Sequence, residues 1–150
     1  KGKELIIEKI STEKKDVIII KSLEELKDCK QIASAHLKSV TNKFRIPAGR
    51  NVACLDFDLI SFPLRIRNWQ KGDVFYPFGM NHRKKLSDYF IDKKLSIFAK
   101  EKILILESEG RIAWIIGERI DNRFRVTEST RRVLILKVQG ELRRSPCQSE

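Results

Sequence analysis

The segment that decides the fold begins with Pro63-Leu64-Arg65-Ile66-Arg67-Asn68-Trp69-Gln70-Lys71-Gly72-Asp73 and continues to Glu128. Apolar and basic residues alternate in it, which predicts a strand because successive strand side chains point to opposite faces. The two arginines and the tryptophan then share one face, with the leucine and isoleucine on the other. Basic residues recur between apolar ones farther along the segment. This pattern is typical of a folded domain that presents cations to a polyanion.

Composition sets the broad class. The chain has 150 residues, which is enough for one ordinary domain, and 41% of them are apolar. A disordered basic tail would be much poorer in apolar residues, so that class is excluded. The formal net charge of +11 favours an acidic partner. Nucleic acid is the first candidate; an anionic membrane surface is disfavoured, because no apolar run approaches the ~18 residues of a spanning helix.

The cysteines and the N-terminus indicate the compartment. Cys29, Cys54 and Cys147 are odd in number and widely spaced, so neither a zinc site nor a redox motif is indicated. Free thiols fit a reducing cytoplasm. The N-terminus carries neither a signal peptide nor an initiating Met. We therefore expect a cytoplasmic protein of which this chain is one piece, with other domains encoded elsewhere.

Apolar periodicity predicts a strand-rich domain with two short helices. A β-hairpin is expected from Leu5–Ile10 and Val17–Ile20. A helix is expected from Leu23 to about Leu37, where Ser22 and Glu25 have the spacing of a capping box. Further strands are expected over residues 52–55, 64–69, 103–106, 112–116 and 133–138, and a second helix over residues 84 to about 95. Many short strands with two short helices indicate the α+β class.

The expected domain organisation has three parts. Residues 1–61 form an N-terminal hairpin and helix, either as a linker or as the start of the same domain. Residues 62–138 form the core of an RNA-binding domain. Residues 139–150 are polar and lack periodicity, which predicts a disordered tail.

The segment from Arg119 to Val126 is the first candidate site. As a strand it would place Arg119, Asp121, Arg123 and Arg125 on one face. Three guanidinium groups around one carboxylate leave a surplus that suits phosphate. A solvated strand face with one salt bridge is the alternative.

A second candidate lies at the start of the predicted helix at residue 84. Arg83, Lys84 and Lys85 are unfavourable beside the positive end of a helix unless an anion docks there. We therefore predict a phosphate contact. The alternative is that the helix begins with Ser87 as its N-cap and that the lysines lie in a loop.

Other residues that could carry chemistry have simpler explanations. Trp69 could stack on a base, although a tryptophan at such a position more often lies in the core. Asp56 and Asp58 are too few for a metal site and are expected at a turn or helix start. His36 and His82 are isolated. No phosphate-binding or nucleophile motif is present, so we expect neither an active site nor a metal site here.

These blocks resemble the C-terminal domain of the tRNA(Ile)-lysidine synthetase family over about residues 62–138. The resemblance rests on Leu64 to Asp73, Pro77-Phe78-Gly79-Met80, Lys84 to Asp92, Trp114-Ile115-Ile116-Gly117 and Arg119-Ile120-Asp121. It implies a sandwich-like module similar to a domain of the phenylalanyl-tRNA synthetase β subunit. It also implies an enzyme that uses ATP to attach lysine to the wobble cytidine of the minor isoleucine tRNA. The catalytic domain, with its ATP and Mg²⁺, would lie outside this chain, which should not catalyse anything itself.

The same resemblance implies that this domain binds the tRNA acceptor stem. A homodimer is left open, and the domain is expected to pack near the catalytic and helical domains. The candidate phosphate or sugar contacts are Arg65, Arg67, Lys71, Arg83, Lys84, Lys85, Lys93, Lys94, Arg119, Arg123 and Arg125. One rival is a basic protein-interaction module without RNA specificity, and the other is a metal nuclease that uses Asp56 and Asp58.

Overall fold

The computed structural model describes residues 17–139. The first strand of the predicted hairpin, residues 140–150 of the predicted tail, and Cys147 lie outside these residues. The elements, in chain order, are β1 (Ile18–Ile20), α2 (Leu23–Lys27), β2 (Ser34–Ser39), β3 (Val52–Asp56), η1 (Phe57–Leu59), β4 (Leu64–Asn68), β5 (Val74–Phe75), β6 (Lys84–Lys85), α3 (Leu86–Asp92), α4 (Ile97–Glu101), β7 (Leu104–Ser108), β8 (Arg111–Ile115), η2 (Asn122–Phe124) and β9 (Arg132–Lys137).

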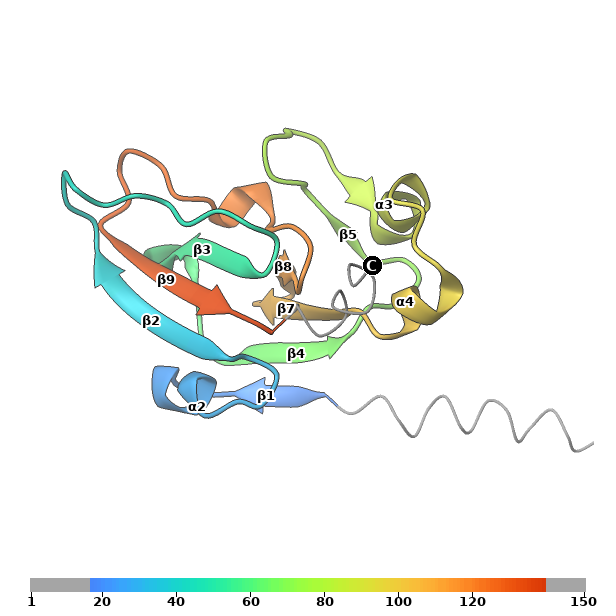
Figure 1. Ribbon diagram of the computed structural model, residues 1–150, viewed down its shortest axis with the longest axis horizontal. Helices are drawn as coiled ribbons and strands as arrows, with labels where there is room; N and C mark the ends of the chain where they lie inside the picture. The colour runs from blue at the N-terminus through green and yellow to red at the C-terminus, as the bar shows by residue number, and fades with distance from the viewer. Residues whose placement is uncertain (1–16, 140–150) are drawn as a thin grey trace, which may run out of the picture.

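Two antiparallel sheets make the body of the domain (Figure 1). One has the strand order β1-β4-β7-β8 and the other has the order β2-β9-β3. Apolar side chains from both sheets form one buried cluster, which includes Ile66 and Trp114 from the first sheet and Leu55 and Leu134 from the second. The predicted strand-rich, sandwich-like α+β fold is therefore confirmed.

Strand β9 is the centre of the smaller sheet, and both of its neighbours precede residue 62. Its register pairs Ser34–Ser39 on one side and Val52–Asp56 on the other. Leu134 and Leu136 face the main core, whereas Val133 and Ile135 belong to a second cluster that is covered by Phe44 and Val52. Residues from the N-terminal third and the C-terminal end of the chain therefore share one core.

A third apolar cluster covers the other face of the larger sheet. Ile105, Ile112 and Ile115 of β7 and β8 pack there against Phe75 and the buried face of α3. Figure 1 shows α3 and α4 together at one end of the molecule, beside β5. This lobe carries the basic residues that follow residue 82, so its packing fixes where they lie.

The predicted first helix is wrong beyond Lys27. Chain segment Ser34–Ser39 is strand β2 because it completes the second edge of β9, over six residue pairs. The leucine at the expected helical spacing, Leu37, is exposed rather than buried. The predicted cap is confirmed: Ser22 Oγ accepts from the N–H of Glu25 at 3.2 Å, and Glu25 Oε1 accepts from the N–H of Lys21 at 2.7 Å.

The helix count also differs from the expectation. Helix α4 was not predicted, although Ser96 is its N-cap and accepts from the N–H of Ala99 at 3.1 Å. Its five residues include no buried side chain, so no apolar period signals it. Among the helices of residues 17–139, none is long and apolar enough to cross a membrane.

Candidate nucleic-acid interface

The segment from Arg119 to Val126 is not a strand, which corrects the sequence prediction. Residues Asn122–Phe124 form a single 3₁₀ turn, η2, and Asn122 and Phe124 are buried. Asp121 is the N-cap of this turn and its side chain is fully buried. The four charged residues therefore do not share one flat face. The prediction that alternate residues here lie on one face of a strand is wrong at Asp121.

Asp121 organises its surroundings through hydrogen bonds. Its carboxylate accepts from the backbone N–H groups of Tyr76 at 2.9 Å and Arg123 at 2.8 Å. It also receives Nε and Nη2 of Arg123, each at 3.0 Å, and this guanidinium lies 4.4 Å from the centre of the Tyr76 ring. Arg123 is thus held in place, and part of its donor capacity is already used.

A β-bulge in β8 lies next to the backbone of Asp121. Leu106 pairs with Trp114 and Glu107 pairs with Ile112, so Ala113 is the extra residue. The carbonyl of Ala113 accepts from the N–H of Asp121 at 2.9 Å. The bulge therefore anchors the backbone that carries the buried carboxylate.

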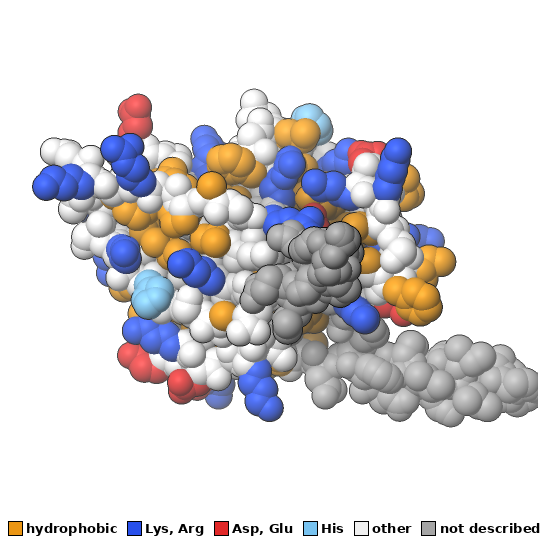
Figure 2. Space-filling view, viewed as in Figure 1, with side chains coloured by type: hydrophobic (Ala, Val, Ile, Leu, Met, Phe, Trp, Pro, Cys, Tyr) orange, Lys and Arg blue, Asp and Glu red, His pale blue; other side chains and the backbone are white. Residues whose placement is uncertain are grey.

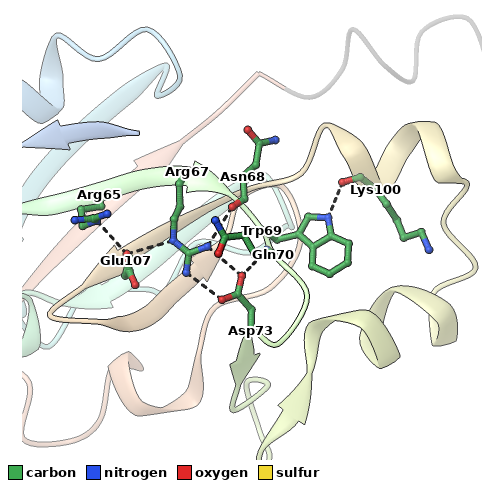
Figure 3. A network of polar contacts seen from close by, with 8 residues as sticks. All are labelled: Arg65, Arg67, Asn68, Trp69, Gln70, Asp73, Lys100 and Glu107. Carbon is green, nitrogen blue, oxygen red and sulfur yellow. Dashed lines mark hydrogen bonds and ion pairs between the residues drawn. The ribbon is translucent and has the colours of Figure 1, made fainter. Parts of the chain in front are cut away.

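Arg67 lies within a network of carboxylates (Figure 3). Its two Nη atoms each lie 3.0 Å from a different oxygen of Asp73, and its Nε lies 3.4 Å from Glu107. Only 13% of the side chain is exposed. Burial tends to lower the pKa of Arg67, but hydrogen bonds to Asp73 and Glu107 outweigh this and raise it. Arg67 therefore braces β4 against the turn that follows it.

Arg65 and Trp69 share the strand face with Arg67 but differ from it in exposure. The Arg65 side chain is 48% exposed and its Nε lies 3.3 Å from Glu107. Trp69 is half-buried, donates from Nε1 to the carbonyl of Lys100 at 2.8 Å and meets Phe90 edge-on. The core interpretation of Trp69 is the one that the contacts favour.

The basic run after residue 82 starts differently from either expectation. Lys84 and Lys85 form the short strand β6, which pairs with β5, and the helix begins at Leu86 with Lys85 as its N-cap. Lys84 forms an ion pair with Asp92 at the end of the same helix. Arg83 and Lys85 are exposed. Two of the three cations therefore project into solvent.

Several cations meet around Tyr89. Lys93 Nζ lies 5.7 Å from the centre of its ring, and its hydroxyl lies 3.3 Å from Glu118 Oε1. Burial raises the pKa of Tyr89 to about 12 and Glu118 adds to this, whereas Arg119 and Arg50 oppose it. The fold thus places Lys93 over the Tyr89 ring and brings Arg119 and Arg50 close enough to act on its hydroxyl, although the three come from separate segments.

Arg50 is a residue that the sequence analysis missed. It ends a loop whose basic residues Lys43, Arg45 and Arg50 are all exposed. This loop reaches the site because Phe44 packs on β9. Phe44 and β9 are far apart in the chain, as are the paired strands β3 and β9. No local sequence pattern therefore signals that this loop contacts β9.

Exposure separates the predicted contacts into two groups. Figure 2 shows lysine and arginine side chains spread over several elements on one face of the molecule. Seven of the predicted cations are exposed: Arg65, Lys71, Arg83, Lys85, Lys93, Lys94 and Arg125. Arg67, Lys84, Arg119 and Arg123 are only partly exposed.

Asp56 and Asp58 mark a helix start, as predicted. Asp56 caps η1 by accepting from the N–H of Asp58 at 3.1 Å, and it also accepts from Thr130 Oγ1 at 2.8 Å. Asp58 receives Arg132 Nη2 at 2.8 Å. Within residues 17–139 no group of three or more His, Cys, Asp or Glu side chains could hold a metal ion. This donor set does not suit the metal-nuclease alternative.

The comparisons of this chain with known proteins agree on one protein family. The family described as the TilS substrate C-terminal domain matches residues 64–136. A tRNA(Ile)-lysidine synthase of Parabacteroides distasonis is 52% identical over 101 residues, which are 67% of this chain and 23% of that protein. The tRNA(Ile)-lysidine synthase of Bacteroides thetaiotaomicron is 50% identical over 101 residues, or 67% of this chain and 24% of that protein. The chain therefore spans about a quarter of the length of these relatives.

Two solved structures align with this chain. A crystal structure of the TilS C-terminal domain aligns with a TM-score of 0.61 and 26% identity, covering 71% of this chain and 82% of that one. An N-terminal fragment of the phenylalanyl-tRNA synthetase β subunit from Pyrococcus horikoshii aligns with a TM-score of 0.49 and 24% identity, covering 57% of this chain and 27% of that one.

Proposed function

We propose that this chain binds tRNA as part of a tRNA(Ile)-lysidine synthase, because residues 64–136 belong to the TilS substrate C-terminal domain family. The whole enzyme would attach lysine to the wobble cytidine of the minor isoleucine tRNA in the cytoplasm. Its ATP and Mg²⁺ would be held by a catalytic part outside this chain. The part described here would bind the acceptor stem.

The observation that carries the proposal is the set of exposed cations on a rigid scaffold. Lys71 follows β4, Arg83 precedes β6, Lys85 ends β6, and Lys93 follows α3; all four are exposed. A duplex RNA stem offers phosphates and 2′-hydroxyl groups, and proteins recognise it mainly by shape. Cations fixed on separate elements can match the spacing of phosphates on two strands, which a flexible basic tail cannot do.

The test is binding of the chain to an acceptor-stem minihelix of the minor isoleucine tRNA, titrated with salt, beside a methionine-tRNA minihelix. We expect salt-dependent binding that prefers the isoleucine stem. The variants Arg83→Ala and Lys85→Ala should each lower the salt slope by about one unit. Lys27→Ala, which removes a lysine of α2, is the matched control. Absence of binding at low salt would overturn the proposal.

A protein-docking module is the second candidate function. It is favoured by three large apolar side chains that are exposed on α3 and α4, namely Ile91, Ile97 and Phe98. Competition separates the two candidates. If generic acidic polymers displace the minihelix as well as tRNA does, the RNA-specific interpretation is wrong.

A further inference from the structure

A pocket lies between segments that are far apart in the chain. Its volume is about 350 Å³, at the lower end of the range of pockets that hold small ligands. The loop from Ile46 to Gly49 forms one side, Phe78 and Ile120 form another, and the apolar part of the lining also includes Val52, Cys54 and Val126. The pocket is therefore mainly apolar.

Phe78 is an exposed aromatic residue on a fixed backbone. Its side chain is 51% exposed, yet its N–H donates to the carbonyl of Ile120 at 3.2 Å. The next N–H, of Gly79, donates to Oδ1 of the buried Asn122 at 3.0 Å. Pro77, the residue before Phe78, forms an isolated antiparallel β-bridge with Asp121. The backbone that carries Phe78 is thus fixed at the edge of the pocket before any ligand arrives, which lowers the entropic cost of binding.

One arginine lines the pocket, and two more adjoin lining residues along the chain. Arg119 is one of its lining residues. Arg50 follows Gly49 of the lining and Arg125 precedes Val126, and both are exposed. Arg125 is oriented by a hydrogen bond from Nη1 to the carbonyl of Asn122 at 2.9 Å. The one carboxylate in the lining, Glu118, already accepts from the hydroxyl of Tyr89. An apolar interior with an arginine in its lining complements a flat ring that is linked to a phosphate.

We propose that this pocket binds an unstacked nucleobase, namely the first unpaired nucleotide that adjoins the bound RNA stem. The base would stack on Phe78, and Arg119 would contact the phosphate. Single-stranded bases at the ends of stems are recognised by stacking on aromatic side chains beside cations. This inference rests on the proposed function, because the stem must bind for its end to reach the pocket.

The test compares two RNAs that share one stem, one of them blunt and the other with a short single-stranded 3′ tail. The full 150-residue chain should bind the tailed RNA roughly 5- to 150-fold more tightly, which is the usual effect of stacking one base. Phe78→Ala should abolish this difference and leave the affinity for the blunt RNA unchanged. Phe98→Ala is the matched control, since Phe98 is 76% exposed and does not line the pocket.

The outcomes distinguish the pocket from the stem site. Equal, salt-dependent binding of tailed and blunt RNA by the unmodified chain would overturn the pocket and leave the proposed function standing. Absence of binding to either RNA would overturn both. A photoreactive base at the first unpaired position gives a second measurement without mutation. A crosslink to the peptide that contains Phe78 is expected, and crosslinks only to other peptides would overturn the proposal.

Discussion

At the scale of single residues, the surroundings of each arginine set its role. Arg67 and Arg123 each meet a carboxylate through two nitrogen atoms, whereas Arg65 is half-exposed with one such contact. A guanidinium that is already paired has fewer donors left for phosphate. Arg67 and Arg123 therefore act first as parts of the scaffold.

Substitution of Arg67 separates stability from binding. Arg67→Lys cannot keep the two parallel bonds to Asp73, so we expect the free energy of unfolding to fall by about 1–3 kcal/mol. Denaturant unfolding measures this change. Arg65→Lys is the control, and should change stability by much less because its side chain is 48% exposed. Equal losses for both variants would contradict the assigned role.

Lys94 lies in a backbone conformation that L-residues avoid. Its φ is +61° directly after the C-cap of α3, where helices commonly place glycine. We expect Lys94→Gly to stabilise the domain by about 1 kcal/mol. Thermal unfolding checks this, with Lys93→Gly as control: Lys93 has a φ of −83°, so glycine there should destabilise. A lower melting temperature for Lys94→Gly would contradict the argument.

Tyr89 gives a prediction about alkaline pH. Burial, together with Glu118, raises its pKa from 10.0 to about 12, so the folded state keeps a proton that the unfolded state has lost. This contribution to stability is complete below pH 10 and is lost as the pH rises towards 12. We therefore expect Tyr89→Phe to flatten the fall in stability over that range.

The thiol of Cys54 titrates over a neighbouring pH range and supplies the control for that experiment. Burial raises the pKa of the Cys54 thiol to about 11. Cys54→Ala should therefore flatten the curve at a lower pH than Tyr89→Phe does. Unfolding curves measured from pH 8 upward would decide, and identical curves for the unmodified chain and Tyr89→Phe would contradict the prediction.

At the scale of elements, α3 controls how many cations its N-terminal end presents. Asp92 in the last turn of α3 holds Lys84, which precedes the helix, in an ion pair. The pair shortens the reach of Lys84 toward a ligand, whereas Lys85 is exposed. Asp92, at the C-terminal end of α3, thus reduces the number of free cations at the N-terminal end of this helix.

Removal of that carboxylate should strengthen RNA binding. We expect Asp92→Asn to raise the affinity for the acceptor-stem minihelix about two- to fivefold, as expected for release of a surface ion pair. Fluorescence anisotropy at low salt measures the change. Asp88→Asn, which removes an exposed carboxylate from the first turn of the same helix, controls for net charge. An equal gain for both variants would show that Lys84 is not involved.

At the scale of the whole molecule, the two sheets are held together by a shared apolar core, which contains residues from both ends of the described part of the chain. Strand β9 lies between β2 and β3, and β1 lies at the edge of the larger sheet beside β4. The shared core contains Ile20, Leu26 and Leu55 as well as Leu64 and Leu134. The geometry of the pocket depends on this shared core, because the loop before β3 supplies Ile46 to Gly49 of its lining.

A truncation tests this account of the core. A chain that starts at residue 62 lacks both partners of β9 and leaves Val133 to Leu136 uncovered. We expect it to lose cooperative thermal unfolding and to bind a hydrophobic dye, because exposed apolar surface and unpaired edges do not support a stable fold. A chain of residues 17–139 should unfold cooperatively. Cooperative unfolding of the shorter chain would contradict the shared core.

Several local features of the fold could be predicted from the sequence, and the limits of that prediction have physical causes. The alternation in β4, the cap at Ser22 and the acidic helix start at Asp56 are local patterns, and each is confirmed. The strand prediction failed at Asp121 because hydrogen bonds from Tyr76 and Arg123 make burial of its charge tolerable. Those partners are set by tertiary contacts.

By itself the sequence determined the strand-rich class, the surplus of cations and the segments that carry the family resemblance, because these depend on composition and short-range periodicity. Only the tertiary structure decided which cations are free to bind and which are braced by carboxylates. It also placed Phe78, Arg119 and the loop ending at Arg50 around one pocket. The physical reason is that pairing across β9 and β3, and the bulge at Ala113, join residues that no local pattern connects.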